Sequence, residues 1–154
     1  LLIKMAKEIE TVKCFKIECA QAASKLRKLV LEGGDAIEGP FDGEEGITLF
    51  ADLEAGATGN MSSAMIPDLI KPVVLDYLAG EFDKSEDKYN NVLPLINYEN
   101  RQCGFRATKV IMKEGGVINS DFCRHPISPL EERTKAGLIK LIKKYDPIAL
   151  SWGK

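Results

Sequence analysis

The feature that most constrains this fold is a regular alternation of strand-like and helix-like segments in the amino-terminal part of the chain. Strand-like segments recur at a spacing of roughly 22 residues, with apolar residues at helical spacing between them. These segments are 12–18, 36–38 and 57–62. A connecting helix returns the chain to the same edge of a sheet, so this spacing predicts parallel β/α units. The sequence therefore indicates an α/β protein.

The pattern changes at residue 67, because only helical segments can be recognised beyond that point. We expect these helices at 67–80, 84–99, 103–114 and 129–145. We therefore divide the chain into a β/α part over 1–66 and a helical part over 67–154 of the same domain. The sequence begins at Leu1, without an initiator methionine and already inside a helical pattern, so we expect a chain that is truncated upstream.

Composition excludes several other classes of protein. Hydrophobic residues make up 45% of the chain and charged residues 29%, which allows a packed core and argues against disorder. The 21 basic and 23 acidic residues give a net charge of -2, without the basic surplus of a nucleic-acid-binding protein. No apolar run approaches the roughly 20 residues that a membrane-spanning helix needs. We expect neither a nucleic-acid partner nor a membrane partner.

The cysteines do not form a metal-binding or redox motif. Cys14, Cys19, Cys103 and Cys123 include no C-x-x-C pair, and the single His125 cannot complete a zinc site. We therefore expect four reduced thiols, no bound metal and a cytoplasmic location.

The first strand-like segment carries a candidate catalytic pair. Alternate side chains of a strand face opposite sides, so Lys16 and Glu18 share one face, and Phe15 and Ile17 share the other. On an open sheet with a wet face, the charged pair would be only a solvated ion pair, which is the simpler interpretation from spacing alone. Inside a closed barrel, desolvation lowers the pKa of a lysine, and a neutral amine can attack a ketone to form a Schiff base. A carboxylate two residues along the strand could then move protons to and from the adduct.

Four motifs follow one another along the chain, and their order and spacing identify a protein family more specifically than any single motif does. They are Phe15-Lys16-Ile17-Glu18, Ile37-Glu38-Gly39, the segment from Leu53 to Gly59, and the segment from Arg124 to Leu130. Together they resemble the carboxyl-terminal half of the dihydrodipicolinate synthase/N-acetylneuraminate lyase family, over essentially the whole chain. The resemblance implies strands six to eight of a TIM (β/α)8 barrel, followed by a C-terminal helical extension.

The segment from Gly34 to Glu45 is most similar to the sugar-acid branch of that family, in particular 2-keto-3-deoxyarabonate dehydratases. Dihydrodipicolinate synthases have Glu directly after the lysine, whereas here Ile17 follows Lys16 and Glu18 comes one residue later. This departure favours a lyase that dehydrates a 2-keto-3-deoxy sugar acid, such as 2-keto-3-deoxy-L-arabonate, to a 2-oxo semialdehyde. A dihydrodipicolinate synthase or a 2-keto-3-deoxy acid aldolase is the alternative activity, and a non-catalytic half-barrel fragment is the alternative of another class.

The resemblance implies roles for two residues, and their neighbours suggest roles for two more. Lys16 matches the Schiff-base lysine at the end of the sixth barrel strand, and Gly39 matches a glycine at the pocket near the end of the seventh. We expect Glu18 to transfer protons during catalysis, and Gly39 and Glu38 to bind substrate. The covalent Schiff base through Lys16 would replace any metal or separate cofactor.

Three acids near the second strand-like segment have two interpretations. Glu38, Glu44 and Glu45 could line the pocket, but carboxylates at a helix amino terminus usually only complement the helix dipole. Asp42 and Glu45 also have the spacing of a capping box at the start of the next helix. A helix-start role is therefore the simpler interpretation.

The assembly and the missing parts of the site are implied only by the resemblance. Family members assemble as tetramers, which implies a homo-oligomer that acts on a small 2-keto acid. The family's carboxylate-binding hydroxyl pair and catalytic tyrosine would lie on earlier strands, which this sequence does not contain. An in-frame upstream extension of roughly 150 residues would distinguish an enzyme from a fragment.

Overall fold

The computed structural model describes residues 1–154, and the contacts within it divide the chain into two compact units. The first unit contains 1–62 and 73–86, and the second contains 63–72 and 87–154. Helices α4 (Pro67–Leu78) and α5 (Phe82–Tyr98) each contribute to both units.

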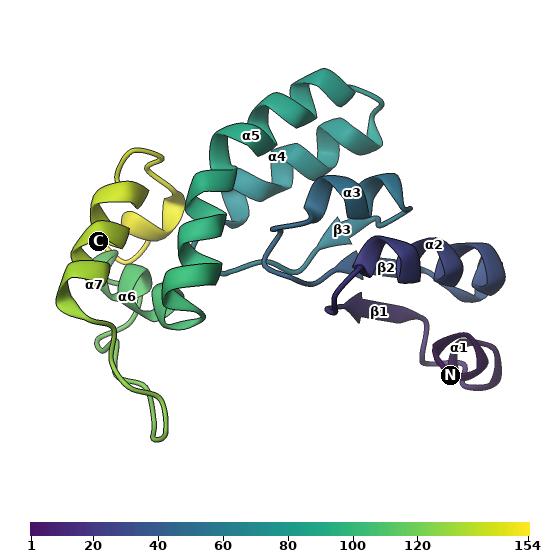
Figure 1. The fold of residues 1–154 in the computed structure, drawn as a ribbon, viewed down its shortest axis with the longest axis horizontal. Helices are drawn as coiled ribbons and strands as arrows, with labels where there is room; N and C mark the ends of the chain where they lie inside the picture. The colour runs from purple at the N-terminus through teal and green to yellow at the C-terminus, as the bar shows by residue number, and fades with distance from the viewer. The chain divides into compact units, whose positions relative to one another are not determined.

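The first unit is built on a three-stranded parallel sheet (Figure 1). Strands β1 (Cys14–Ile17), β2 (Gly39–Asp42) and β3 (Gly59–Asn60) lie in the order β1-β2-β3. Helix α2 (Ala22–Gly33) connects β1 to β2, and helix α3 (Leu49–Glu54) connects β2 to β3. The predicted parallel β/α units are therefore confirmed, and the carboxyl ends of the strands lie at one edge of the sheet.

The helices cover one face of this sheet. In β1, Phe15 and Ile17 are buried whereas Cys14 and Lys16 are exposed, as the alternation of side chains along a strand requires. Helix α2 packs against β1 and β2, and helix α3 packs against β2. The buried residues of α2 and α3 include Ala22, Leu26, Leu29, Leu49 and Leu53. Lys16 therefore lies on the face that the helices leave open.

The second unit is helical. It contains the carboxyl-terminal part of α5, helix α6 (Arg106–Glu114) and helix α7 (Glu132–Ile142), with a π-helical turn at Glu99–Cys103 between α5 and α6. The fully buried large side chains of this unit include Leu95, Ile96, Ile111, Leu138 and Ile142. None of the helices, including the amino-terminal α1 (Leu2–Glu8), has the length and apolar character needed to cross a bilayer.

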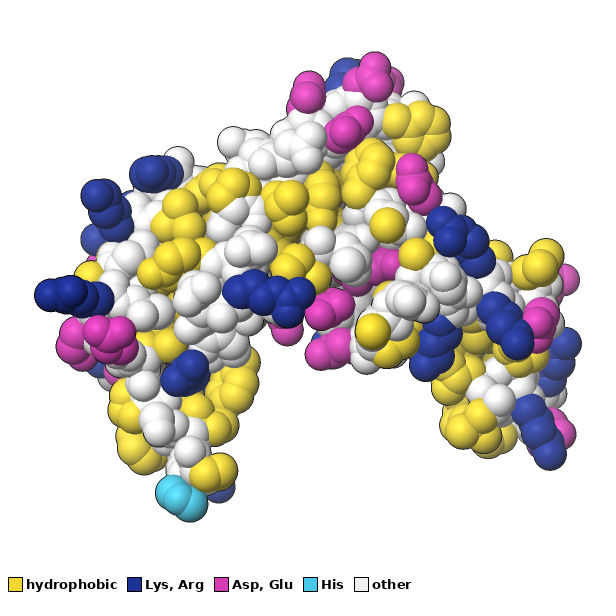
Figure 2. Space-filling model, in the orientation of Figure 1, with side chains coloured by type: hydrophobic (Ala, Val, Ile, Leu, Met, Phe, Trp, Pro, Cys, Tyr) yellow, Lys and Arg dark blue, Asp and Glu magenta, His cyan; other side chains and the backbone are white.

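Apolar side chains are also exposed between charged ones (Figure 2). In the first unit, Leu75, Leu78 and Phe82 of α4 and α5 are each more than half exposed. The ring of Phe82 packs edge-on against Tyr77, with ring centroids 5.0 Å apart, and Tyr77 packs in the same way on Phe50 at 5.4 Å. An aromatic cluster therefore joins the turn between α4 and α5 to α3.

Two predictions around β2 are wrong in position. Residues 36–38 do not form a strand, because the chain continues after α2 through a 3-10 turn at Gly34–Ala36 and enters the sheet only at Gly39. Asp42 is not the cap of the following helix, because it still pairs with Ile17 in the sheet and α3 begins later, at Leu49. Tertiary pairing overrides the local capping pattern at this position.

The tail helices occur where the sequence predicts helices, but they are mostly shorter. Helix α6 begins at Arg106 rather than 103, because the preceding residues form the π-helical turn. Helix α7 covers Glu132–Ile142 rather than 129–145. The prolines Pro72 and Pro94 lie inside α4 and α5 and end neither helix.

Candidate active site

Lys16 and Glu18 form an ion pair at the carboxyl end of β1. Lys16 Nζ lies 2.9 Å from Glu18 Oε2, and the two side chains are 37% and 54% exposed. They meet because Phe15 and Ile17 occupy the opposite, buried face of the strand. The structure therefore brings the amine and the carboxylate together as the sequence predicts, while their catalytic roles remain predictions.

Gly43, the first residue after β2, lies against the stem of Lys16. A Cβ atom at position 43 would lie 2.8 Å from Lys16 Cγ, 2.9 Å from Lys16 Cε and 2.9 Å from the carbonyl oxygen of Ile17. These distances are shorter than carbon–carbon and carbon–oxygen contacts allow, and the carbonyl oxygen belongs to the strand backbone. Only glycine therefore lets the turn after β2 approach Lys16 this closely.

Glu45, in the same turn, interacts electrostatically with the ion pair. Burial raises the pKa of Glu45 above its ordinary value, attraction to Lys16 lowers it, and repulsion by Glu18 raises it. Its backbone has a φ of 55°, in the left-handed region that residues other than glycine seldom adopt. The predicted capping role of Glu45 is wrong, because α3 begins at Leu49 with Thr48 as its N-cap. The turn instead adds a second carboxyl group near the amine.

Glu38 and Gly39, the two predicted substrate-binding residues, lie at the other end of β2. Glu38 pairs with Lys13, with 2.8 Å between Oε1 and Nζ, and Gly39 pairs with Cys14. Lys16 pairs with Phe41, which lies roughly 7 Å further along the strand than Gly39. The structure does not bring Glu38 to the Lys16–Glu18 pair, and substrate binding by Glu38 and Gly39 remains a prediction.

The glycines of the open face make room for Phe41. A Cβ at Gly39 would lie 2.5 Å from the ring atom Cε2 of Phe41, and a Cβ at Gly59 would lie 2.9 Å from its Cδ1. The ring of Phe41 therefore lies across the strands, beside the position that Lys16 occupies on β1. This contact gives Gly39 a packing role that does not depend on substrate.

Gly43 is the site residue that the sequence did not indicate, and Glu45 is one for which the pocket-lining role was the less simple of two interpretations. The available signal was their place directly after a strand, because β/α proteins build their sites from the residues that follow the carboxyl ends of parallel strands. Because the second strand was predicted at 36–38, its carboxyl end was expected at residue 38, whereas β2 ends at Asp42. The structure contains no group of three or more His, Cys, Asp or Glu residues arranged to hold a metal ion, and the four cysteines are free.

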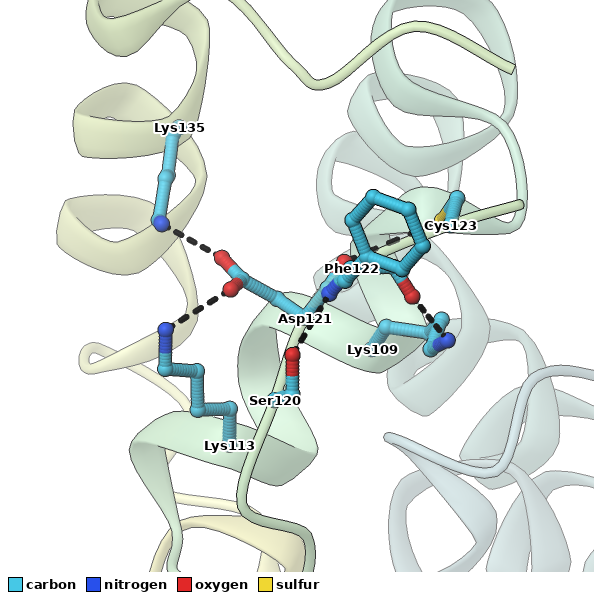
Figure 3. A network of polar contacts seen from close by, with 7 residues as sticks. All are labelled: Lys109, Lys113, Ser120, Asp121, Phe122, Cys123 and Lys135. Carbon is cyan, nitrogen blue, oxygen red and sulfur yellow. Dashed lines mark hydrogen bonds and ion pairs between the residues drawn. The ribbon is translucent and has the colours of Figure 1, made fainter. Parts of the chain in front are cut away.

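A second polar network lies in the helical unit (Figure 3). Asp121 lies between two lysines: Lys113 Nζ is 2.7 Å from Oδ1, and Lys135 Nζ binds Oδ2. The hydrogen bonds from Lys113 and Lys135 hold the pKa of Asp121 well below its usual range. Because α6 supplies Lys113 and α7 supplies Lys135, this network fastens the segment between the two helices to both of them.

Comparison with known proteins identifies relatives along almost the whole chain. Residues 3–145 match the model of the dihydrodipicolinate synthetase family. L-2-keto-3-deoxyarabonate dehydratase from Azospirillum brasilense is 51% identical over 151 residues, which are 98% of this chain and 49% of that protein. The chain thus spans about half the length of this curated relative.

Solved structures show the same fold. Dihydrodipicolinate synthase from Rhodopseudomonas palustris superposes with a TM-score of 0.73 at 26% identity, over 84% of this chain and 44% of that one. The enzyme from Aquifex aeolicus superposes with a TM-score of 0.82 at 20% identity, over 94% of this chain and 49% of that one. The small parallel sheet with its helices is consistent with part of a barrel.

Proposed function

This chain belongs to the dihydrodipicolinate synthetase family, and we propose that it supplies the Schiff-base lysine of a lyase that dehydrates a 2-keto-3-deoxy sugar acid. The observation that carries the proposal is the Lys16–Glu18 pair, 2.9 Å apart on the open face of the sheet at the carboxyl end of β1. β/α barrels place their active sites at this end of the strands. The 51% identity to an L-2-keto-3-deoxyarabonate dehydratase supports 2-keto-3-deoxy-L-arabonate as the substrate.

A closed barrel would give Lys16 the environment that this chemistry needs. We assign β1, β2 and β3 to strands six, seven and eight of a (β/α)8 barrel, with residues 67–154 as the helical part of the same domain. The open face of the sheet then becomes the barrel interior. Lys16, which is 37% exposed in this chain, would lose water there, and desolvation favours the neutral form of a lysine.

The neutral amine of Lys16 attacks the C2 ketone of the substrate, and water leaves to give an iminium ion. The iminium withdraws electrons from C3, so that a carboxylate can remove a proton there. We assign this step to Glu18, and the position of its carboxylate next to the amine supports the assignment. Glu45, whose pKa is raised mainly by burial, suits the acid that protonates the departing C4 hydroxyl group. Proton transfers and hydrolysis of the adduct then release the 2-oxo semialdehyde and regenerate Lys16.

The remaining features of the proposal concern cofactors, assembly and location. The iminium itself is the electron sink, so the reaction requires neither a metal nor a separate cofactor. Membership of the family supports a homo-oligomer, a tetramer, that acts on a small 2-keto acid without a nucleic-acid or membrane partner. The four free thiols support a cytoplasmic location.

Borohydride trapping tests the proposal in the full protein that the reading frame of this chain encodes. Pyruvate and borohydride should leave a stable adduct on the wild-type protein and none on Lys16→Ala. Lys13→Ala is the matched control, because Lys13 lies directly before the same strand but pairs with Glu38. Adduct formation by Lys16→Ala at the wild-type rate would exclude Lys16 as the Schiff-base residue.

Substrate assays separate the related activities. Incubation with 2-keto-3-deoxy-L-arabonate should give a 2-oxo semialdehyde without release of pyruvate. Pyruvate release would indicate an aldolase, and condensation of pyruvate with an aldehyde would indicate a synthase. The same comparison with 2-keto-3-deoxygluconate defines the length of the sugar acid that the site accepts.

A further inference from the structure

Two aspartates are buried together beneath the turn that carries Gly43 and Glu45. Asp42 is the last residue of β2 and Asp52 lies in α3, and both residues are 0% exposed. Asp42 pairs with Ile17, the neighbour of Lys16, and so lies on the helix-covered face of the sheet. The dehydration chemistry proposed above does not use either carboxyl group. Burying two carboxylates side by side is costly unless a proton or a cation compensates them.

The hydrogen bonds around the pair leave one of its four carboxyl oxygens without a donor. Asn60 Nδ2 donates to Asp42 Oδ2, the backbone N–H of Glu44 donates to Asp42 Oδ1 at 3.4 Å, and Thr48 Oγ1 donates to Asp52 Oδ2 at 2.7 Å. Asp52 Oδ1 is buried without a donor. The two carboxyl groups lie within hydrogen-bonding reach of each other, so a proton on Asp42 can be donated to Asp52. A single proton on Asp42 therefore supplies the donor that Asp52 Oδ1 lacks, while the amide oxygen of Asn60 stays without a donor.

We propose that Asp42 and Asp52 share one proton and act as positioning residues, which hold the turn after β2 against the Schiff-base lysine. The pair links the end of β2 to α3, and the bonds of Asp42 with Asn60 and Met61 link it to β3. The next residue in the chain, Gly43, lies against the Lys16 stem. The inference deepens the proposed function and rests on it, because it assigns the turn a role only if Lys16 is the reacting group.

The surroundings of Asp42 make its protonation dependent on Asp52. The pKa of Asp42 is raised to about 7, first by burial and then by the hydrogen bond and the negative charge of Asp52. The Glu44 N–H and the Asn60 amide act in the opposite direction. From β1 the neighbour is the apolar Ile17, and the buried face of α2 consists of Ala22, Leu26, Leu29 and Gly33. Asp52 is thus the titratable group that faces Asp42 from the packed elements.

Loss of the shared proton should therefore disturb the site at alkaline pH. With both carboxylates charged, the two side chains repel each other inside the protein, and the contact between β2 and α3 loosens. The turn then no longer holds Gly43 against Lys16, and the rate of adduct formation falls as the pH rises above about 7.

The test compares three variants of the full protein, with pyruvate as the probe and borohydride-trapped adduct as the readout from pH 5 to pH 9. Asp42→Asn keeps a permanent donor toward Asp52 and should form adduct at close to the wild-type rate at pH 6, without the alkaline decline. Asp42→Ala leaves Asp52 without that donor and should slow adduct formation about tenfold or more at every pH. Asp35→Asn removes the same charge from an exposed position and should follow the wild type.

The outcomes separate this inference from the proposed function. If Asp42→Asn keeps the wild-type alkaline decline, the shared proton is refuted, and unchanged adduct formation by folded Asp42→Ala refutes the positioning role. If Asp42→Ala does not fold, Asp42→Asn alone decides the question. If the wild type forms no adduct, the proposed function fails, and the shared proton is then tested by thermal unfolding. In that case the Tm of the wild type should fall relative to Asp42→Asn between pH 5 and pH 8, and parallel Tm curves would overturn the inference.

Discussion

Asp121 in the helical unit and Asp42 in the β/α unit are both held by polar networks, but the two networks have opposite electrostatics. Asp121 lies between Lys113 and Lys135, and these partners hold its pKa well below the usual range. Asp42 faces a second aspartate, and burial with that like charge raises its pKa to about 7. In the first network, the two lysines neutralise the carboxylate and hold the segment between α6 and α7 in place. The second brings two acidic side chains together beneath the turn that contacts the candidate catalytic lysine, and functional sites commonly contain such perturbed groups.

Two glycines of the first unit also differ in what they contact. Gly43 lies against Lys16 and the backbone of β1, whereas Gly39 lies against the ring of Phe41 and the Cys14 thiol. If the site lies at the carboxyl ends of the strands, only the first of these glycines should matter directly for chemistry.

The largest effect is expected from Gly43→Ala. The added Cβ would overlap with Lys16 and with the Ile17 carbonyl, so the amine would be displaced, and we expect adduct formation to fall about 100-fold. Borohydride trapping with pyruvate measures this rate. Gly39→Ala is the matched control and should reduce stability more than adduct formation. An equal loss in both variants would place Gly39 in the substrate site, as the sequence predicted.

An intermediate effect is expected on the pH dependence of stability, with opposite signs for the two aspartates. Because the folded state raises the pKa of Asp42, its stabilising contribution is present below the ordinary value of 3.8 and is lost as the pH rises toward about 7. Because the folded state lowers the pKa of Asp121, its contribution is present above 3.8 and is lost as the pH falls below that value.

Thermal unfolding from pH 3 to pH 8 measures both contributions. The wild type should lose stability of the order of 4 kcal/mol between pH 3 and pH 8 as Asp42 loses its proton, and Asp42→Asn should not show this loss. Asp121→Asn should destabilise the protein at neutral pH by about 1 kcal/mol, since solvent screens this partly exposed network. A Tm difference of the same sign and pH dependence in the two variants would contradict the contrast between the networks.

The smallest effect is expected from Glu38→Gln. Glu38 pairs with Lys13 at the amino end of the strands, and both side chains are partly exposed. An ion pair of this kind contributes little to stability, so the Tm should not change measurably. The rate of dehydration of 2-keto-3-deoxy-L-arabonate should also stay at the wild-type level. A rise in KM without a change in Tm would show that Glu38 does bind substrate.

The sequence predicted the features of this chain that depend on local patterns. The order of strands and helices follows from periodicity, and the meeting of Lys16 with Glu18 follows from the alternation of side chains along β1. The placement of Gly43 and Glu45 depends on the register between β1 and β2, which brings together residues that are distant in sequence. The spacing of Asp42 and Glu45 also occurs in capping boxes, and only the contacts of Asp42 with Asp52 and Asn60 reveal its different role.

The most direct test of the central claim is to locate the trapped adduct in the wild-type protein. The full protein is incubated with 2-keto-3-deoxy-L-arabonate and borohydride, digested, and analysed by peptide mass spectrometry. We predict a single modified lysine, in the peptide that contains Lys16. An adduct on any other lysine, with an unmodified Lys16 peptide, would contradict the assignment of this residue as the Schiff-base lysine.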